Sequence, residues 1–505
     1  MSVVLERTRS CWMDVQSVPA PSLDREEKAD VVVVGAGIAG LSTAYELAAK
    51  GRSVVVLDRG PIARGMTSRT TAHLASELDD FYHALIEMRG LELARIHYES
   101  QHAAINRMDE IQAAEGIDCD FRRLDSYLFA AREDDREILE REFEACRRVG
   151  LAVDWAERAP LSIDTGRCLR FAQQGRVHPL KYLNGLAAWL QRQGARLYGD
   201  TIVTTVEEDD GGVTVSTTAG HKIRGGTAVV ATNSPINDRL AIHSKQAPYR
   251  TYVIAGHVRA GSVPDALYWN TLDPYHYVRL QPDGERGDLL IVGGEDHRTG
   301  EQNDGKQRFG ALEEWARRHF PEFGKIAYRW SGQVQEPVDY CAFIGLNPGS
   351  KRVYVATGDS GQGITGGVVA SLLISSLIVD KESRWQELYE PSRKPIGAAT
   401  EFMRENMTVV KNFTEYLTGG DIASVEALPA GEGAVVRKGL KKIAAYRDES
   451  GTVQLHSAVC PHSGCIVHWN STEQCWDCPC HGSHFAADGR TLNAPAISPL
   501  DPAQD

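Results

Sequence analysis

DVVVVGAGIAGLSTAYELAAKGRSVVVLD, residues 30–58, begins with a run of valines that predicts a buried parallel strand. Gly35, Gly37 and Gly40 follow this run, and the apolar spacing after them predicts a helix that ends at Gly51. A second valine-rich run predicts another strand, which ends at Asp58. Strand, glycine-rich turn, helix, strand and terminal acid in this order predict a dinucleotide-binding unit far more strongly than the glycines alone.

Each of these residues has a physical role in such a unit. Gly35 permits the tight turn, Gly37 lets a pyrophosphate approach the backbone, and Gly40 allows close packing of helix and strand. The unpaired N–H groups of the helix N-terminus face the phosphates. We expect Asp58 to accept hydrogen bonds from the ribose hydroxyls, which favours an adenosine without a 2′-phosphate. An α/β unit that binds no nucleotide is the alternative.

Three further segments distinguish FAD from NAD as the nucleotide. A polar loop, RGMTSRTTAH, follows Asp58 at residues 64–73, and GTAVVATN at 226–233 predicts a strand. VYVATGDSGQGITGG at 353–367 predicts a strand that enters a second glycine-rich turn and a helix. In this order the segments resemble the D-amino-acid-oxidase-like flavoproteins, of the glycine oxidase and sarcosine oxidase type, over residues 30–385. In that family the chain leaves the FAD domain twice and returns to complete it.

The resemblance implies FAD as cofactor and assigns residues to it. Gly35, Gly37, Gly40 and Asp58 would hold the ADP half, Val203 would lie near the adenine, and Thr67 and Ser68 would pass the flavin side. Near the isoalloxazine and ribityl chain the resemblance places Gly358, Gly361, Gly363 and Thr365. A helix starting near Thr365 would direct its positive end at the flavin, where it would stabilise negative charge. Non-covalent binding is favoured, although Cys341 and His73 lie in regions where a covalent link is conceivable.

The segment at about 245–340 predicts an antiparallel substrate domain, because aromatic-rich strands alternate in it. In relatives such a sheet lies across the flavin, and a Tyr or Arg on it often holds a substrate carboxylate. Tyr252, Tyr277 and Arg279 are therefore weak catalytic candidates. Ordinary cross-strand pairing explains these residues equally well.

GGEDHRTG at 293–300 is glycine-rich, but no packing helix follows it. It therefore does not predict a separate NAD(P)H domain, and electrons would enter or leave by another route.

CPHSGCIVHWNSTEQCWDCPCHGSHF, residues 460–485, carries the second set of chemistry-bearing residues. Cys460-x-His462 and Cys478-x-x-His481 form two mirrored pairs of soft and imidazole ligands. Such a set suits tetrahedral zinc or a mixed-ligand iron–sulfur cluster. The Cys-x-His spacing is awkward for zinc and fits a [2Fe–2S] cluster better, since each loop can give one Cys to one iron and one His to the other. A structural zinc ribbon is the alternative.

Cys465 and Cys480 occupy matched places beside these pairs, and Gly482-Ser483 follow them. The stretch resembles the Rieske family of the respiratory and photosynthetic type. The resemblance implies Cys460, His462, Cys478 and His481 as cluster ligands and a disulfide between Cys465 and Cys480. Respiratory members carry a Tyr two residues after the Ser, and here that place is Phe485. Ser483 can still donate a hydrogen bond to a bridging sulfide. The Tyr hydroxyl is missing, however, and the loss of this one donor predicts a potential below the respiratory type.

These segments predict an α/β FAD-binding Rossmann-like domain with an inserted antiparallel α+β substrate domain, followed by a small all-β Rieske domain. The oxidoreductase domain would span 30–390, with FAD-binding parts at about 30–80, 150–240 and 340–385. Residues 80–150 are rich in helix formers and would cover the sheet or the active site. The remaining boundaries are an irregular lead-in at 1–29, a linker helix at 391–420 and the Rieske domain at 421–505.

Composition limits the classes of function. A net charge of −13 argues against a nucleic-acid binder, and no apolar stretch is long enough to span a membrane. The N-terminus lacks an apolar segment of signal-peptide length, so we expect a cytoplasmic protein. A disulfide is unusual in that compartment, though cluster loops can shield one. The other cysteines are scattered, and buried or free surface thiols explain them.

The sequence predicts a dehydrogenase that oxidises a small amine or amino-acid-like substrate. Hydride transfer to FAD would be followed by single-electron transfer to the Rieske cluster and on to an external acceptor such as a quinone, a cytochrome or a small redox protein. Three alternatives remain: electron flow in the reverse direction for substrate reduction or hydroxylation, an oxidase with a regulatory cluster, and a redox sensor without turnover.

Overall fold

The valine run that begins at Val31 forms the central strand of the nucleotide-binding sheet. In β1 (Glu27–Val34) the valines are buried, and Val33 pairs in parallel with Val56 of β2 (Val54–Leu57) and Val229 of β10 (Lys222–Val230). The computed structural model describes residues 6–237, 242–394 and 396–503. In this part of the chain the sheet has eight strands, in the order β16, β17, β10, β1, β2, β7, with the β8–β9 hairpin joined to β10. The other strands are β7 (Arg196–Tyr198), β8 (Val203–Asp209), β9 (Gly212–Thr217), β16 (Phe343–Leu346) and β17 (Val353–Thr357).

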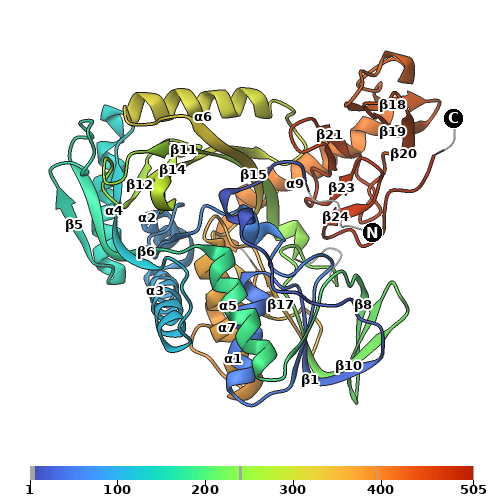
Figure 1. Ribbon diagram of the computed structural model, residues 1–505, viewed down its shortest axis with the longest axis horizontal. Helices are drawn as coiled ribbons and strands as arrows, with labels where there is room; N and C mark the ends of the chain where they lie inside the picture. The colour runs from blue at the N-terminus through green and yellow to red at the C-terminus, as the bar shows by residue number, and fades with distance from the viewer. Residues whose placement is uncertain (1–5, 238–241, 395, 504–505) are drawn as a thin grey trace.

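A layer of helices packs on this sheet. α7 (Gly363–Val379) is apolar on nearly every side, as a helix must be when it is buried between other elements. It packs against α1 (Ile38–Ala49) and α3 (Leu91–Ala114), and α1 also contacts α5 (Pro179–Arg192). Figure 1 shows α1, α5 and α7 side by side below the substrate domain. The starts of α1 and α7 therefore come to the same region of the fold.

The second sheet has nine strands in the described chain, in the order β15, β11, β14, β13, β12, β4, β6, β3, with β5 paired to β6. Five of them come from the segment predicted as the substrate domain: β11 (Gln246–Val258), β12 (Leu267–Asn270), β13 (Tyr277–Pro282), β14 (Asp288–Arg298) and β15 (Ile326–Pro337). The others come from earlier in the chain: β3 (His73–Leu74), β4 (Arg122–Phe129), β5 (Val153–Ala156) and β6 (Cys168–Arg176). β4 joins the two groups by pairing in parallel with β12. Part of the predicted helical cover and part of the predicted FAD-binding segment therefore belong to this sheet.

Helices cover the outside of the second sheet and its end. α6 (Gly305–His319) packs Phe309 and Leu312 against one face of the sheet, above the sheet in Figure 1. α2 (Tyr82–Arg89) and α4 (Arg136–Val149) pack against each other near β5 and β6. The opposite face of the sheet looks toward the nucleotide-binding sheet.

The C-terminal domain lies beside the second sheet and is linked to it by α9 (Ala399–Thr414), which follows α8 (Gln386–Tyr389) (Figure 1). It consists of two small antiparallel sheets, one of three strands and one of four, in the described chain. Their strands are β18 (Gly433–Lys438), β19 (Lys441–Arg447), β20 (Val453–Ser457), β21 (His468–Asn470), β22 (Cys475–Asp477), β23 (His484–Ala486) and β24 (Thr491–Asn493).

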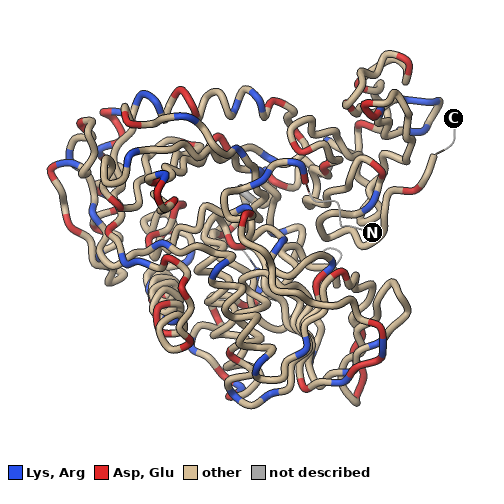
Figure 2. Tube along the Cα trace, in the orientation of Figure 1, with Lys and Arg blue, Asp and Glu red and all other residues tan. Residues whose placement is uncertain are grey.

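Among the described residues, every helix is too short or too polar to cross a bilayer. Figure 2 shows acidic and basic residues interspersed along all parts of the fold.

Candidate functional site

A cavity of about 830 Å³ runs between the two sheets and reaches the C-terminal domain. One end is lined by the glycine turn after β1, including Gly35 and Gly37, and by Asp58. The middle is lined by the start of α7 and by strands of the second sheet. At the other end Thr491 and Asn493 of β24 contribute to the wall. A single cavity therefore borders all three parts of the fold.

The glycine turn leaves no space for side chains. Gly35 has φ +104°, and a Cβ there would lie 2.3 Å from the carbonyl oxygen of Ala231. A Cβ at Gly40 would lie 1.8 Å from the carbonyl oxygen of Gly35, so Gly40 is required for packing and does not line the cavity. Gly37 is the N-cap of α1 and offers no side-chain cap, and the start of the helix at Gly37, Ile38 and Ala39 lines the cavity.

Asp58 closes this turn from the end of β2. Its carboxylate accepts hydrogen bonds from the backbone N–H of Ala36 (2.7 Å) and of Gly60 (2.9 Å). Burial raises the pKa of Asp58 above its ordinary value. The carboxylate lines the cavity beside the glycine turn, which is the place expected for a ribose ligand.

Most of the other predicted FAD residues line the same cavity, and some do not. Thr67, Val203, Gly361 and Gly363 line it. Thr67 also accepts a hydrogen bond from the N–H of Ile38 at the start of α1.

Ser68, Gly358 and Thr365 lie behind the cavity wall. The hydroxyl of Ser68 donates to the carbonyl oxygen of Gly65 (2.8 Å), and the hydroxyl of Thr365 donates to that of Gln362 (3.3 Å). α7 begins at Gly363, so Gly361 and Gly363, rather than Thr365, face the cavity at the helix start.

The three catalytic candidates are separated by the structure. Tyr277 lines the cavity, with its hydroxyl 2.6 Å from that of Thr251. Tyr252 lies on the face covered by α6, where its hydroxyl contacts His297. Arg279 is fully buried and donates to the backbone carbonyls of Thr71, Ala72 and Val177. Only Tyr277 of the three is therefore placed to contact a substrate.

The polar loops of the C-terminal domain bring the predicted cluster residues together. The N–H of Cys460 donates to the carbonyl of Cys465 (2.8 Å), and the N–H of Cys478 donates to that of Ser483 (2.9 Å). Each pair closes one of two loops, and a disulfide joins Cys465 to Cys480 across them.

The donor set in these loops fits an iron–sulfur cluster. The thiols of Cys460 and Cys478 contact each other, and the rings of His462 and His481 lie 4.8 Å apart. Nδ1 of His481 is buried and has no hydrogen-bond partner among the described residues. A buried imidazole nitrogen beside two thiols is suited to a metal. Ser483 directs its hydroxyl at Cys460, while Phe485 is buried in the core of the domain.

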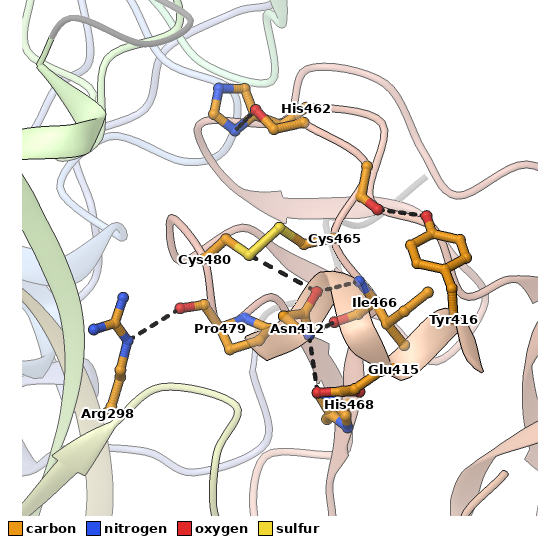
Figure 3. Close-up of a disulfide and its surroundings, with 12 residues drawn as sticks. Arg298, Asn412, Glu415, Tyr416, His462, Cys465, Ile466, His468, Pro479 and Cys480 are labelled. Atoms are coloured by element: carbon orange, nitrogen blue, oxygen red, sulfur yellow. Dashed lines mark hydrogen bonds and ion pairs between the residues drawn. A yellow bond between two sulfur atoms is a disulfide. The ribbon is translucent and has the colours of Figure 1, made fainter. Parts of the chain in front are cut away.

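α9 and the substrate domain hold the cluster loops in place. The side chain of Asn412 accepts a hydrogen bond from the N–H of Ile466 (2.8 Å) and donates to its carbonyl (3.2 Å). Figure 3 shows Asn412 beside the disulfide, with Arg298 of β14 directed from the other side at the carbonyl of Pro479. α9 therefore contacts the first cluster loop at Ile466, and β14 contacts the second at Pro479.

The face of the cluster histidines is covered by the oxidoreductase part. His243, in the 3₁₀ turn η4 (His243–Lys245) before β11, places its ring 4.9 Å from that of His462 and 5.5 Å from that of His481. The side chain of Gln333 on β15 donates to the carbonyl of Gly482 (3.0 Å) and contacts His484 (2.7 Å). His481 is consequently only 7% exposed, whereas the neighbouring Pro461 is exposed.

A buried charge network extends this interface. Arg250 of β11 contacts both carboxylate oxygens of Asp477 (3.1 Å each). Arg69 pairs with Glu6 (3.2 Å) and Glu473 (3.3 Å). These side chains are almost fully buried and come from the N-terminal segment, the FAD-binding part, the second sheet and the C-terminal domain. Neither His243 nor this network could be predicted from the sequence, because no residue near them in the chain indicates what they contact.

The glycines of the segment GGEDHRTG, residues 293–300, lie where the chain packs tightly against the cavity wall and the cluster loop. A Cβ at Gly293 would lie 2.3 Å from the ring of Tyr277, and one at Gly300 would lie 3.1 Å from the backbone nitrogen of Pro479. Asp296 lines the cavity between them. The glycines thus allow one strand to contact both the cavity wall and the cluster loop.

Comparisons with known proteins agree with this geometry. The FAD dependent oxidoreductase family matches residues 30–377, and the Rieske [2Fe-2S] domain family matches residues 420–503. The chain belongs to the FAD-dependent oxidoreductase family and carries a C-terminal Rieske domain. This confirms the predicted family, fold class and pair of cofactors.

Three relatives illustrate the similarity. YhfW of Bacillus subtilis (strain 168), described as a Rieske 2Fe-2S iron–sulfur protein, is 29% identical over 500 residues, which cover 98% of this chain and 97% of that protein. Gamma-glutamylputrescine oxidoreductase of Escherichia coli (strain K12) is 27% identical, over 71% of this chain and 86% of its own. The crystal structure of glycine oxidase from Geobacillus kaustophilus aligns with a TM-score of 0.61 and 21% identity, over 73% of this chain and 99% of that one.

Proposed function

We propose that this FAD-dependent oxidoreductase oxidises a small amine or amino-acid-like substrate and passes the electrons through its Rieske cluster to an external acceptor. FAD held by the glycine turn and Asp58 would supply a hydride acceptor, and a cluster held by Cys460, His462, Cys478 and His481 would supply one-electron transfer. A cluster with histidine ligands has a potential of about −150 to +300 mV, well above that of plant-type all-cysteine clusters. Flow from flavin to cluster is therefore expected to be downhill.

The contact of His243 with His462 and His481 carries this proposal. A regulatory cluster would have no need of its histidine ligands packed against the substrate domain. Thr491 and Asn493 of the Rieske domain line the same cavity as the glycine turn. Together these contacts favour a relay within one chain over an isolated sensor.

Residues of this chain can be assigned to binding of the nucleotide, the substrate and the external acceptor. The open start of α1 and Asp58 bind the nucleotide, and Gly361 and Gly363 allow close approach at the start of α7. Tyr277 lines the substrate end. The external acceptor would approach on the side of Pro461, because this side of the cluster loops is exposed while His481 is covered.

An anaerobic titration tests the direction of electron flow. The purified holoprotein is mixed with candidate amines and amino acids while flavin absorbance and the paramagnetic signal of the reduced cluster are followed. Flavin bleaching followed by appearance of the cluster signal is expected. A substrate that bleaches the flavin and leaves the cluster oxidised while peroxide forms stoichiometrically would instead indicate an oxidase. Reduction of the flavin only by a reduced cluster would reverse the proposed direction.

A further inference from the structure

One region of the cavity wall is built from carboxylates that four separate segments contribute. Glu77 and Asp79 lie in the loop before α2, and Asp359 lies in the loop before α7. Asp296 comes from β14 and Glu336 from β15. All five line the cavity. Their convergence from distant parts of the sequence shows that the fold assembles an acidic pocket there.

Several of these carboxylate oxygens have no partner in the described protein. Glu77 is only 5% exposed, and its Oε2 is buried without a hydrogen-bond partner among the described residues. The same holds for one carboxylate oxygen each of Asp79, Asp296 and Asp359. A buried carboxylate oxygen without a hydrogen-bond donor is disfavoured, even where the other oxygen of the group has one. The pocket therefore needs an occupant that brings positive charge or hydrogen-bond donors.

The charges around the pocket do not supply this partner. Asp359 raises the pKa of Asp79, and Asp79 and Asp80 raise that of Glu336, in each case after burial itself. Arg308 of α6 is a cation that faces Asp296. Arg69, which also lines the cavity, pairs with Glu6 and Glu473 rather than with these acids. The carboxylates of this pocket repel one another, and they would also repel a carboxylate of the substrate.

An aromatic wall borders the carboxylates. The rings of Trp269, Tyr275 and Tyr277 form a continuous series, with centroids 6.1 Å and 5.4 Å apart. Phe81 stacks on Trp269 at 5.7 Å. The hydroxyl of Tyr275 donates to Asp79 (2.8 Å). Aromatic faces next to carboxylates are the environment that recognises ammonium groups.

The spacing of the carboxylates argues for an organic cation rather than a metal ion. Among the described residues, three or more ligand atoms of His, Cys, Asp or Glu gather within 4.8 Å of one another only at Cys465, Cys478 and Cys480. The acids of the pocket are thus too far apart to coordinate one ion. An extended cation with charges at intervals matches them better.

We infer that the substrate is an aliphatic diamine or polyamine whose remote ammonium group is held by this acidic pocket, and that no carboxylate of the substrate is recognised. The inference rests on the amine oxidation proposed above and specifies its substrate class. In that reaction the reacting nitrogen loses a proton and its neighbouring carbon loses a hydride to FAD. Water then hydrolyses the resulting imine to an aldehyde, with release of ammonia from a primary amine or of the remaining amine from a secondary one.

Binding to the oxidised holoenzyme tests the inference without turnover. Calorimetric titrations compare 1,4-diaminobutane and spermidine with butylamine, glycine and Mg²⁺. They are carried out under nitrogen and at low temperature, so that binding is measured before the flavin is reduced. The diamine and spermidine are expected to bind at least about tenfold more tightly than butylamine, which has the same carbon chain as the diamine and a single charge. Equal affinity of butylamine, tighter binding of glycine, or tighter binding of Mg²⁺ overturns the inference.

Variants locate the binding. Glu336→Gln and Asp79→Asn are each expected to weaken diamine binding about tenfold or more, because each removes one charged partner. Glu295→Gln is the matched control, since Glu295 lies beside Asp296 on β14 and pairs with His276 outside the cavity wall. Thermal unfolding checks that each variant is folded, and Asp79→Asn replaces Glu336→Gln if the latter is not. An effect of Glu295→Gln as large as that of the pocket variants overturns the inference.

Anaerobic flavin bleaching separates the two proposals. A diamine that binds and bleaches the flavin supports both. A diamine that binds in the pocket and does not bleach the flavin preserves the cation site and overturns the proposed amine oxidation. Bleaching by an amino acid together with undetectable diamine binding preserves the proposed function and overturns the polyamine assignment.

Discussion

The imidazole of His243 lies edge-on against the imidazole of His462, with ring centroids 4.9 Å apart and planes at 71°. His243 belongs to the turn that leads directly into β11, and Thr251 on β11 lines the cavity. One short segment thus contacts the predicted cluster ligand His462 at one end and lines the cavity at the other.

Gly300→Val should loosen this arrangement and leave both cofactors in place. A Cβ at Gly300 would meet the backbone nitrogen of Pro479 at 3.1 Å, so a valine there would push the cluster loop away from β14. We expect the rate of cluster reduction by substrate to fall about tenfold or more, while flavin reduction and the cluster's paramagnetic spectrum stay the same. Rapid-mixing spectroscopy under nitrogen measures both rates.

Gly261→Val is the control, because Gly261 has a similar φ of +73° and no atom within 4 Å of its added Cβ. It carries the same backbone strain without the contact. Equal rates of cluster reduction in the two variants would show that close docking is unnecessary.

Arg250→Met should destabilise the whole chain. Arg250 is fully buried and lies between Asp477 and Glu6, so its loss leaves buried carboxylates without their cation. Removing one partner of a buried ion pair typically costs about 3–5 kcal/mol in free energy of unfolding. Urea denaturation followed by flavin fluorescence and tryptophan fluorescence measures this loss. Arg286→Met removes an exposed ion pair with Asp283 and should change little; a similar small effect at Arg250 would contradict the prediction.

The features predictable from the sequence are those whose physics is local. The turn at Gly35 and Gly37 follows from neighbouring residues, because the strand, the turn and the helix N-terminus are contiguous. The cluster motif is likewise contained in two short loops. Chemistry within such segments needs no knowledge of the rest of the fold.

Side-chain direction and long-range pairing could not be predicted in this way. Strand alternation divides the side chains of β11 and β13 between two faces of the sheet, but it does not say which face lines the cavity. The sequence alone therefore could not show that Tyr277 lines the cavity while Tyr252 and Arg279 do not. The pairing of β4 with β12 joins residues far apart in sequence. The acidic pocket and the contact of His243 depend on the same long-range arrangement.

Phe485→Tyr should raise the midpoint potential of the cluster. Phe485 stands where respiratory Rieske proteins have a Tyr, and it is buried in the core of the domain that carries the cluster loops. A hydroxyl donating to a ligand sulfur stabilises the reduced cluster. One hydrogen bond worth about 1 kcal/mol corresponds to about 40 mV for a single electron. Redox titration monitored by paramagnetic resonance measures the shift, and an unchanged or lower potential would contradict it.

The acidic pocket should make stability and amine binding depend on pH in opposite ways. Burial raises the pKa of Glu77 to about 7, that of Asp79 to about 6 and that of Asp296 to about 7. Since these values lie above those of the unfolded chain, the folded protein binds more protons between about pH 4 and 7. Its free energy of unfolding is therefore expected to fall as the pH rises through this range, by up to about 1.4 kcal/mol per pH unit for each of the three groups.

A diamine should reverse this trend, because it binds the ionised carboxylates. The nearby His73 does not compensate, because burial lowers its pKa to about 3 and it stays neutral, and the guanidinium of Arg308 faces Asp296. The rise in melting temperature caused by 1,4-diaminobutane is expected to be large at pH 8 and small at pH 5.5, where the amine is still fully charged. Thermal unfolding of the oxidised holoprotein with and without the diamine measures it. In Asp79→Asn and Glu336→Gln the difference between the two pH values should shrink, whereas a shift of equal size at both pH values in the unsubstituted protein would place the diamine outside the pocket.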